Sequence, residues 1–355
     1  MSGAFGWQRN NDPGDAPAAN PGYFNQPSRA VPDVVVTHVN PPAAAKPSVA
    51  RPAPVVRPSI HSVAVKLPVP NGQGAQKTTG EIVIVVALDV TPSMSERPVE
   101  IFKRLSHFHN SACDYFGTDN IDVLFIAHGD ARTDRNAIQI GRVARGHELE
   151  PILASFDRTC GGGGQGSESH EIIATYLTQQ LDTSSARQVY TFFVTDEAAC
   201  DQIDPRLVER ELGIRRNDLP IDTKQVFDAL RLRSNVYTIL FPTDSYSETR
   251  GKGFRASWEH LVGRENVLAL DDERRTVDVM LGVFAKTTGQ IDRFSKDLVA
   301  WQGNSVFAQQ NVKTVMGSIA LVGANAPQLP SRAITHRGTK SLLLPSGTPP
   351  TRTKK

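Results

Sequence analysis

The chain has 355 residues, a formal net charge of +2 and 39% hydrophobic residues. This length allows one large α/β domain with extensions or two small domains, and the composition excludes an acidic disordered chain and a strongly basic nucleic-acid binder. The charge is uneven, because residues 330–355 hold six basic side chains and no acidic one. The middle of the chain is therefore net acidic.

The cysteines and the first residues indicate a compartment. The chain contains Cys113, Cys160 and Cys200, which form no CxxC pair and no Cys/His ligand spacing. This pattern argues against a disulfide framework or a zinc site and favours a reducing compartment. No apolar stretch approaches the roughly 20 residues of a membrane span, and the N-terminus lacks the basic and hydrophobic regions of a secretory signal. We therefore expect a cytoplasmic protein with no membrane partner.

Residues 1–79 are rich in proline, alanine, asparagine and glycine. Proline at this density removes backbone donors and disfavours helix, so we expect a disordered region with polyproline-like character. Two short apolar segments, Val34–Val36 and Ile60–Val65, interrupt this region. Each could bind a partner, add an edge strand or remain solvated. Residues 331–355 are expected to form a basic disordered tail.

Strand and helix patterns alternate from Gly80 to about Gly289, which gives a predicted domain over 80–289. Apolar runs predict strands at Ile82–Leu88, Ile121–Ala127, Ala137–Ala144, Val189–Val194, Asn235–Phe241 and Val267–Leu270. Amphipathic patterns predict helices at Arg97–Phe116, Glu148–Phe156, Ser167–Leu181, Gln225–Leu232, Ser257–Val262 and Asp272–Thr288. We expect Ala137–Ala144 to be a half-exposed edge strand. The alternation is typical of an α/β, doubly wound, mostly parallel sheet with helices on both faces.

Residues 290–330 form an extension with two interpretations. A helix that docks on the domain would use Phe294, Leu298, Val299 and Trp301. Further along, Val312–Val322 is compatible with either a strand or a buried helix.

The first predicted strand leads directly into a set of oxygen-bearing side chains. Ile82–Leu88 is an unbroken apolar run rich in β-branched residues, which is typical of a strand buried on both faces. Asp89, Thr91 and Ser93 then alternate. Open α/β sheets bind ligands at the carboxyl ends of their strands, and oxygen ligands suit a hard cation such as Mg²⁺. A turn in which Asp89 caps the next helix is the alternative.

The Asp89-x-Thr91-x-Ser93 pattern resembles the metal-ion-dependent adhesion site (MIDAS) motif of von Willebrand factor A (vWA) domains, whose form is Asp-x-Ser-x-Ser. After the strand at Val189–Val194, Thr195-Asp196-Glu197 resembles the Thr-Asp-Gly signature of the family. The Asp of that signature is a metal ligand. The resemblance therefore implies that Asp89 and Asp196 flank one crevice at the edge of the sheet.

The glycine-rich stretch Gly161–Glu171 resembles the vWA loop that supplies one more metal-binding Thr. That Thr falls on Gly166 here, and Ser167 could supply a hydroxyl instead, or water could take the place. Ser167 could also act as the N-cap of the following helix. The resemblance implies a weakly bound Mg²⁺, or Mn²⁺ or Ca²⁺, with the ligands Asp89, Thr91, Ser93, Asp196 and Ser167.

The resemblance implies an intracellular protein-binding module, a scaffold or adaptor, in which the cation captures an Asp or Glu of a partner protein. Two other functions remain open. One is a phosphatase-like hydrolase that uses the strand-end Asp89 as nucleophile, although Thr91 stands where such enzymes have a second Asp. The other is a scaffold or nucleic-acid-associated protein tethered by the basic tail, which could contact phosphates only weakly and non-specifically. We expect no enzymatic activity.

Overall fold

The computed structural model describes residues 75–94, 97–157, 167–215, 222–242, 248–303 and 306–323. Most of the proline-rich region 1–79, both of its apolar segments, Gly166 and the basic tail 331–355 lie outside the described residues. No helix among the described residues is long and apolar enough to cross a membrane.

The strands are β1 (Gln76–Lys77), β2 (Ile82–Asp89), β3 (Ile121–His128), β4 (Ile138–Ile140), β5 (Ser167–Glu168), β6 (Leu181–Asp182), β7 (Gln188–Thr195), β8 (Ala198–Ala199), β9 (Asn235–Leu240) and β10 (Val267–Ala269). The α-helices are α1 (Arg97–Lys103), α2 (Leu105–Phe116), α3 (Leu149–Ser155), α4 (His170–Gln179), α5 (Pro205–Leu212), α6 (Thr223–Arg231), α7 (Glu248–Val262), α8 (Thr276–Thr287), α9 (Ile291–Gln302) and α10 (Ala308–Ser318). Short 3₁₀ turns are η1 (Pro92–Met94), η2 (Gly146–Glu148), η4 (Arg264–Asn266) and η5 (Glu273–Arg275).

The main sheet has six strands in the order β10-β9-β7-β2-β3-β4. All neighbours pair in parallel except β3 and β4, which are antiparallel. From β2 the chain proceeds to β3 on one side, whereas β7, β9 and β10 fill the other side, so the strand order reverses between β2 and β7. This is the topological switch point of a doubly wound sheet. The predicted fold class is confirmed.

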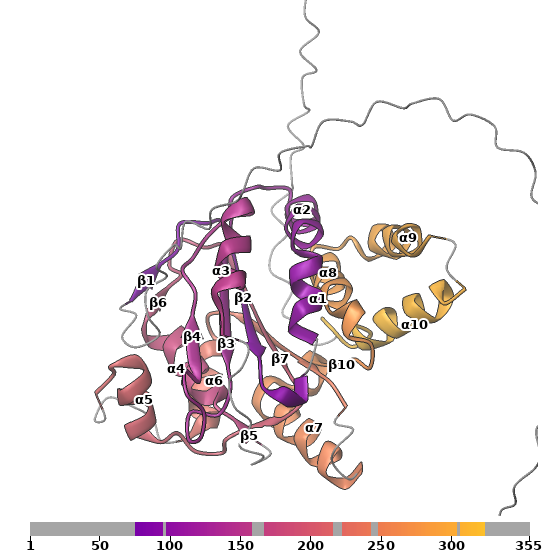
Figure 1. Ribbon diagram of the computed structural model, residues 1–355. Helices are drawn as coiled ribbons and strands as arrows, with labels where there is room; N and C mark the ends of the chain where they lie inside the picture. The colour runs from indigo at the N-terminus through magenta and orange to yellow at the C-terminus, as the bar shows by residue number, and fades with distance from the viewer. Residues whose placement is uncertain are drawn as a thin grey trace, which may run out of the picture. The chain divides into compact units, whose positions relative to one another are not determined.

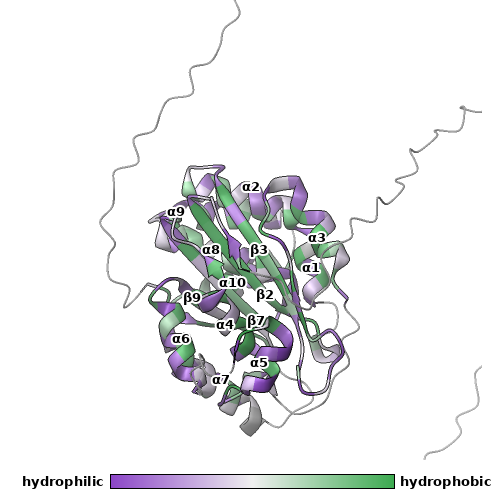
Figure 2. Ribbon diagram, turned by 90° about the vertical axis from the view of Figure 1, so that its left-hand side faces the viewer, coloured by the Kyte–Doolittle hydropathy of each residue, from purple (hydrophilic) through white to green (hydrophobic). Residues whose placement is uncertain are grey.

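Every residue of β2 is buried, because helices cover both faces of the sheet. Ile82, Ile84, Val86 and Leu88 join a core formed with α2, α3, α8, α9 and α10. Val83, Val85 and Ala87 join a second core formed with α4, α5, α6 and α7. Figure 1 shows α1, α2 and α8 on one side of the sheet and α4 and α6 on the other, and Figure 2 shows β2, β3 and β7 as hydrophobic strands between them.

The prediction of one helix over Arg97–Phe116 is wrong in one respect. The segment forms two helices, α1 and α2, which are separated at Arg104. Arg104 has φ −113° and ψ 13°, outside helical geometry. Its guanidinium donates to the Asp278 carboxylate and to the carbonyl of Arg274. These distant partners explain the break, because the local apolar spacing continues through it.

The predicted half-exposed strand Ala137–Ala144 is also corrected. Only Ile138–Ile140 forms a strand, and all three residues are buried. Gln139 Nε2 donates to the carbonyl of Asp157, and the Asp157 amide donates to Gln139 Oε1. The segment after α3 thus covers this edge of the sheet and supplies partners for a buried polar side chain.

Residues 291–322 extend the packed region beyond Gly289 with two helices, α9 and α10. Phe294 and Leu298 are fully buried, whereas Val299 is 54% exposed. The helices approach α8 closely at Gly282, where an added Cβ would lie 2.7 Å from Ile319 Cδ1. The first segment is therefore the predicted docking helix, although Trp301 is exposed, and the second is a helix that ends at Ser318 and in which only Val315 is buried, so it is neither the strand nor the buried helix that we predicted.

Candidate metal site

The two predicted carboxylates lie at the carboxyl ends of neighbouring strands. Leu88 of β2 pairs with Val194 of β7, so Asp89 ends β2 beside the end of β7, and Asp196 follows directly. Asp89 is fully buried, and Asp196 is 2% exposed. The structure thus places both at the switch point of the sheet, where ligands bind in this class of fold.

A chain of hydrogen bonds connects the predicted ligands. The Thr91 amide and hydroxyl donate to Asp89 Oδ1 at 2.9 and 2.6 Å. The Thr91 and Ser93 hydroxyls are 3.1 Å apart, and Ser93 Oγ donates to Asp196 Oδ1 at 3.0 Å. On the other side, the Thr195 hydroxyl donates to Asp89 Oδ2 at 2.9 Å. Thr195 therefore positions the Asp89 carboxylate, a role that the sequence motif alone does not indicate.

Local turn chemistry explains the alternation of these side chains. A carboxylate that accepts from the amide two residues later forms an Asx-turn, which Asp89 and Thr91 make here. The turn continues into η1, and Ser93 there is exposed to solvent while Met94 is buried. Three oxygen-bearing side chains, those of Asp89, Thr91 and Ser93, therefore lead from the buried strand end to the surface, so that an ion could reach them.

The charge at Asp89 is poorly compensated. Burial, together with the nearby Asp196 carboxylate, raises the pKa of Asp89 to about 7, and the hydrogen bonds from Thr91 and Thr195 offset this only in part. Burial also raises the pKa of Asp196, against which Ser93 and Arg97 act. Among the described residues, ion pairs reach Asp196 but not Asp89. A bound cation would stabilise both carboxylates in their charged forms.

Arg97 is the cationic side chain beside Asp196. Its Nη1 donates to Asp196 Oδ2 at 3.3 Å and to the Ser93 carbonyl at 3.0 Å. The guanidinium also lies 4.9 Å from the centroid of the Phe241 ring. Arg97 was missed by the sequence analysis, although it is the first residue of the helix that follows the motif.

Ser167 has different surroundings from the other four candidates. It lies in β5, which pairs with β8, and its hydroxyl accepts from Arg132 Nη2 at 3.1 Å and lies 3.7 Å from Cys200 Sγ. The predicted N-cap role is wrong, because α4 begins at His170 after Ser169. The Ser169 hydroxyl instead accepts from the Ala131 amide. The structure thus joins Asp89, Thr91, Ser93 and Asp196 in one hydrogen-bonded set that does not include Ser167.

The donor chemistry of this set fits a hard cation. Two carboxylates and two hydroxyls are the oxygen ligands that Mg²⁺ prefers. No group of three or more His, Cys, Asp or Glu side chains suited to a metal occurs in the described part of the chain. At this edge, Thr91 and Ser93 add two hydroxyl oxygens to the carboxylates of Asp89 and Asp196.

A buried histidine pair lies on the same side of the sheet as Asp89. His128 pairs with Asp89 across β2 and β3, and its ring is 4.5 Å from the ring of His170. All four ring nitrogens are buried without hydrogen-bond partners. Burial lowers the pKa of His128 to about 3 and, with the neighbouring His128, lowers that of His170 well below its usual value.

We expect His170→Phe to protect the domain from acid. A pKa lowered by folding means that the folded state binds fewer protons, so stability is full above the unfolded pKa of about 6.5 and is lost as pH falls below it. Relative to the wild type, the variant should gain about 1.4 kcal/mol of unfolding free energy per pH unit below 6.5. Urea denaturation at pH 7 and pH 5 measures this difference, and equal differences at both pH values would contradict it.

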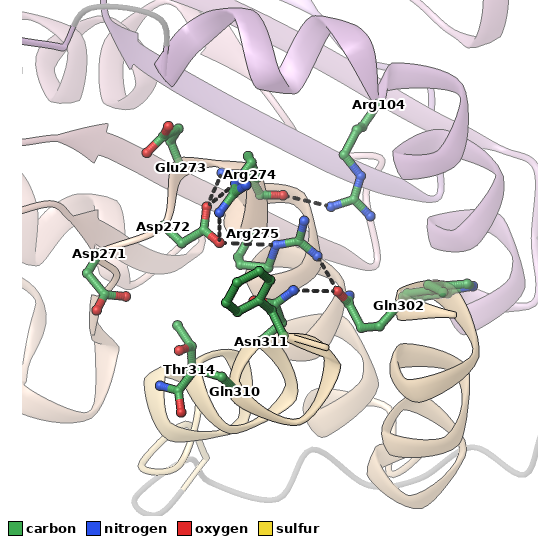
Figure 3. A pocket seen from close by; sticks show the side chains of 12 residues that line it. Arg104, Asp271, Asp272, Glu273, Arg274, Arg275, Gln302, Gln310, Asn311 and Thr314 are labelled. Atoms are coloured by element: carbon green, nitrogen blue, oxygen red, sulfur yellow. Dashed lines mark hydrogen bonds and ion pairs between the residues drawn. The ribbon is translucent and has the colours of Figure 1, made fainter. Parts of the chain in front are cut away.

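A separate pocket of about 870 Å³ lies among η5, α9 and α10 (Figure 3). Arg274 Nε donates to Asp272 Oδ1 at 2.8 Å, and Arg275 Nη1 donates to Asp278 Oδ2 at 3.0 Å. Arg104 Nη2 donates to the other oxygen of Asp278 at 2.5 Å. Because these charges neutralise one another, we assign the pocket lining a structural role, in which it ties the α1–α2 junction to the start of α8.

No family model and no curated protein matches this chain. Solved structures that are similar include the pilus adhesin SpaC from Lactobacillus rhamnosus GG, at 12% identity and a TM-score of 0.42, over 63% of this chain and 32% of the adhesin. Another is proximal thread matrix protein 1 from the mussel byssus, at 10% identity and a TM-score of 0.39, over 61% of this chain and 49% of that protein. The matched region spans less than half of either protein.

Proposed function

We propose that the domain is a cation-dependent protein-binding module of the vWA type, which acts by binding rather than by catalysis. Asp89, Thr91, Ser93 and Asp196 would hold Mg²⁺, or Mn²⁺ or Ca²⁺, and the bound ion would capture an Asp or Glu of a partner protein. The observation that carries the proposal is the hydrogen-bonded chain from Asp89 through Thr91 and Ser93 to Asp196 at the switch point.

The division of ligands into charged and neutral explains why a partner carboxylate would bind. A bound cation would supply a Lewis-acidic position for one further oxygen. Asp89 and Asp196 together carry at most two negative charges, and Thr91 and Ser93 add neutral oxygens. Thr195 and the Thr91 amide hold the Asp89 carboxylate in place, which limits the reorganisation that binding requires.

A cytoplasmic location is part of the proposal. Cys113 and Cys200 are free thiols in the structure, which is the usual state in a reducing compartment. Such a module would act there as a scaffold or adaptor, with the partner's acidic side chain as the recognised feature.

Affinity capture on the immobilised full chain tests the proposal. Lysate of the source cells is applied in Mg²⁺, in EDTA, and in EDTA followed by excess Mg²⁺. We expect a partner that binds in Mg²⁺, is released by EDTA and returns with Mg²⁺, and whose capture is blocked by substituting the acidic residue that it presents. A partner retained equally in Mg²⁺ and EDTA would place the binding surface elsewhere on the protein.

We expect Arg97→Gln to strengthen cation binding about tenfold, because a guanidinium near the site repels a divalent ion by on the order of 1–2 kcal/mol even at high dielectric. Arg97 contacts Asp196 at 3.3 Å and so competes with a cation for that carboxylate. Calorimetric titration with Mg²⁺ measures the change. The matched control is Arg145→Gln, which removes an arginine paired with Asp122, the second residue of β3. Weaker binding by Arg97→Gln would show that Arg97 supports the site.

A further inference from the structure

We infer that the segment Arg332–Lys340 of this chain docks in the pocket among η5, α9 and α10 and contacts two acidic and two aromatic side chains there. The four pocket side chains are those of Asp271, Glu273, Trp301 and Phe307. The ion pairs that give the pocket lining its structural role do not use Asp271 or Glu273. The inference concerns a second surface of the protein and goes beyond the proposed function.

The carboxylates at the pocket outnumber the guanidinium groups. The three arginines of the lining pair with Asp272 and with the buried Asp278. Asp271 is exposed and Glu273 is half-buried, and neither forms an ion pair with any described residue. Four carboxylates therefore stand against three guanidinium groups, and Figure 3 shows both unpaired acids on the same side of the pocket as Asp272. Cationic side chains can bind Asp271 and Glu273 without breaking the structural pairs.

Exposed aromatic rings form the other part of this surface. Five of the six large hydrophobic side chains that are exposed in the described part of the chain lie from Val299 to Leu321. Trp301 is 37% exposed and Phe307 is 66% exposed, and both line the pocket. The Trp301 ring packs edge-on against the ring of His107, with centroids 4.4 Å apart, which holds it in place. Arginine and lysine suit such a surface, because ring faces and carboxylates attract the same cation.

The basic tail 331–355 carries the charge that the pocket lacks. It contains six lysine and arginine side chains and no aspartate or glutamate. Three of the six are Arg332, Arg337 and Lys340, which stand within nine residues near the start of the tail. An apolar peptide would leave both carboxylates without a counter-charge, so charge complementarity favours this basic segment as the occupant.

The chain between α10 and the segment is long enough for docking within one molecule. α10 supplies Thr314 of the pocket lining, and the described residues end at Gly323. Thr314 lies about 6 Å along the helix from Ser318, and the five residues after Ser318 span at most about 17 Å. The nine residues from Gly323 to Arg332 span up to about 30 Å, so Arg332 reaches the pocket. The short connection also raises the effective concentration of the segment above that of a separate molecule.

Acrylamide quenching of tryptophan fluorescence in the full chain tests the inference. The chain has three tryptophans, and a Trp7→Phe background leaves Trp258, which is fully buried, and Trp301, which reports on the pocket. The tail variant carries three substitutions in this background, Arg332→Gln, Arg337→Gln and Lys340→Gln. We expect its quenching constant to be about twofold higher than that of the background chain, since a stacked guanidinium covers about half of the exposed ring.

A charge-matched control and a salt titration separate this contact from general attraction. Arg352→Gln, Lys354→Gln and Lys355→Gln together remove the same charge farther along the tail, and they should leave the quenching constant unchanged. Raising NaCl to about 0.5 M should increase quenching in the background chain, because salt screens exposed charges. The same salt should add little in the tail variant, whose docking cations are already removed.

Substitutions in the pocket test the other side of the contact. Asp271→Asn combined with Glu273→Gln should raise the quenching constant as the tail variant does. Glu150→Gln combined with Asp201→Asn is the control, since it removes two exposed acids that do not line the pocket, and it should have no effect. Thermal denaturation shows that each variant is folded.

Three results would overturn the inference. The first is a quenching constant that neither the tail variant nor salt changes, which would show that the tail does not cover Trp301. The second is an equal rise in the tail variant and in its charge-matched control, which would indicate attraction without a docked segment. The third is protection of Trp301 that is lost on dilution, which would assign the pocket to the tail of a second copy. None of these results bears on the cation site, because no variant changes Asp89 or Asp196.

Discussion

Asp89→Asn will abolish cation-dependent partner binding and leave the domain folded. Asp89 Oδ1 and Oδ2 accept from Thr91 and Thr195, and the asparagine side chain keeps one oxygen for these donors while it removes the charge. We expect Mg²⁺ affinity to fall by at least about 100-fold, because the number of charged ligands tunes such sites over orders of magnitude. Asp89→Ala would have the same effect on binding, but it leaves three donors without their acceptor, at roughly 1–3 kcal/mol for each buried one.

Calorimetry and thermal denaturation together measure this prediction. Asp122→Asn provides the control, because Asp122 is a buried strand aspartate near the amino end of β3. Asp122 forms an ion pair with Arg145 and accepts hydrogen bonds from the amides of Thr79 and Gly80. Removing its charge should therefore lower the stability of the domain and leave cation binding unchanged. If Asp89→Asn retains partner binding and Asp122→Asn loses it, the binding site lies at the amino edge of the sheet, and the proposed site at the carboxyl edge is wrong.

Among the proposed substitutions, Asp278→Ala will lower the free energy of unfolding most. Asp278 is fully buried, accepts from Arg104 Nη2 at 2.5 Å and accepts from Arg275 Nη1 at 3.0 Å. Its removal leaves the Arg104 guanidinium, which is 21% exposed, without a carboxylate, and leaves Arg275, which is 16% exposed, with only the Asp272 carboxylate at 3.7 Å. Breaking a buried pair costs about 3–5 kcal/mol, and we expect a value near 3 kcal/mol because the arginines retain some contact with water.

Urea denaturation measures this loss. Asp228→Ala is the matched control, since Asp228 also pairs with two basic residues, Lys224 and Arg231, but is 51% exposed. Exposed pairs contribute about 0–1 kcal/mol, so the control should remain close to the wild type. A similar small loss in both variants would show that the Asp278 network adds little to the stability of the domain.

The strands and the position of the site could be predicted because their signals are local. β2 begins with an unbroken apolar run, β3, β7 and β9 are mostly apolar, and parallel strands end at a common edge. Asp89 and Asp196 follow two of these runs, so their placement at one edge followed from the order of the strands. The helix α5 also had a local signal in Asp204 and Pro205, an N-cap followed by proline, that the sequence analysis did not use.

The features that were missed depend on distant residues. The break at Arg104 requires Asp278, which is 174 positions away. The start of α4 at His170 depends on the β5–β8 pairing, which joins Ser167 to Ala198. Two-residue strands have no periodicity that a sequence pattern could reveal, so the sequence predicts a helix from Ser167 where the structure has a strand.

The most direct test of the central claim is anomalous scattering from crystals of the domain grown or soaked in MnCl₂. We predict one Mn²⁺ peak at the switch point, at about 2.0–2.3 Å from Ser93 Oγ and within the reach of Thr91, with Asp89 and Asp196 as its carboxylate neighbours. A map with no peak beside Ser93 at millimolar Mn²⁺, or with the guanidinium of Arg97 still on Asp196 and the ion bound elsewhere, would contradict the account.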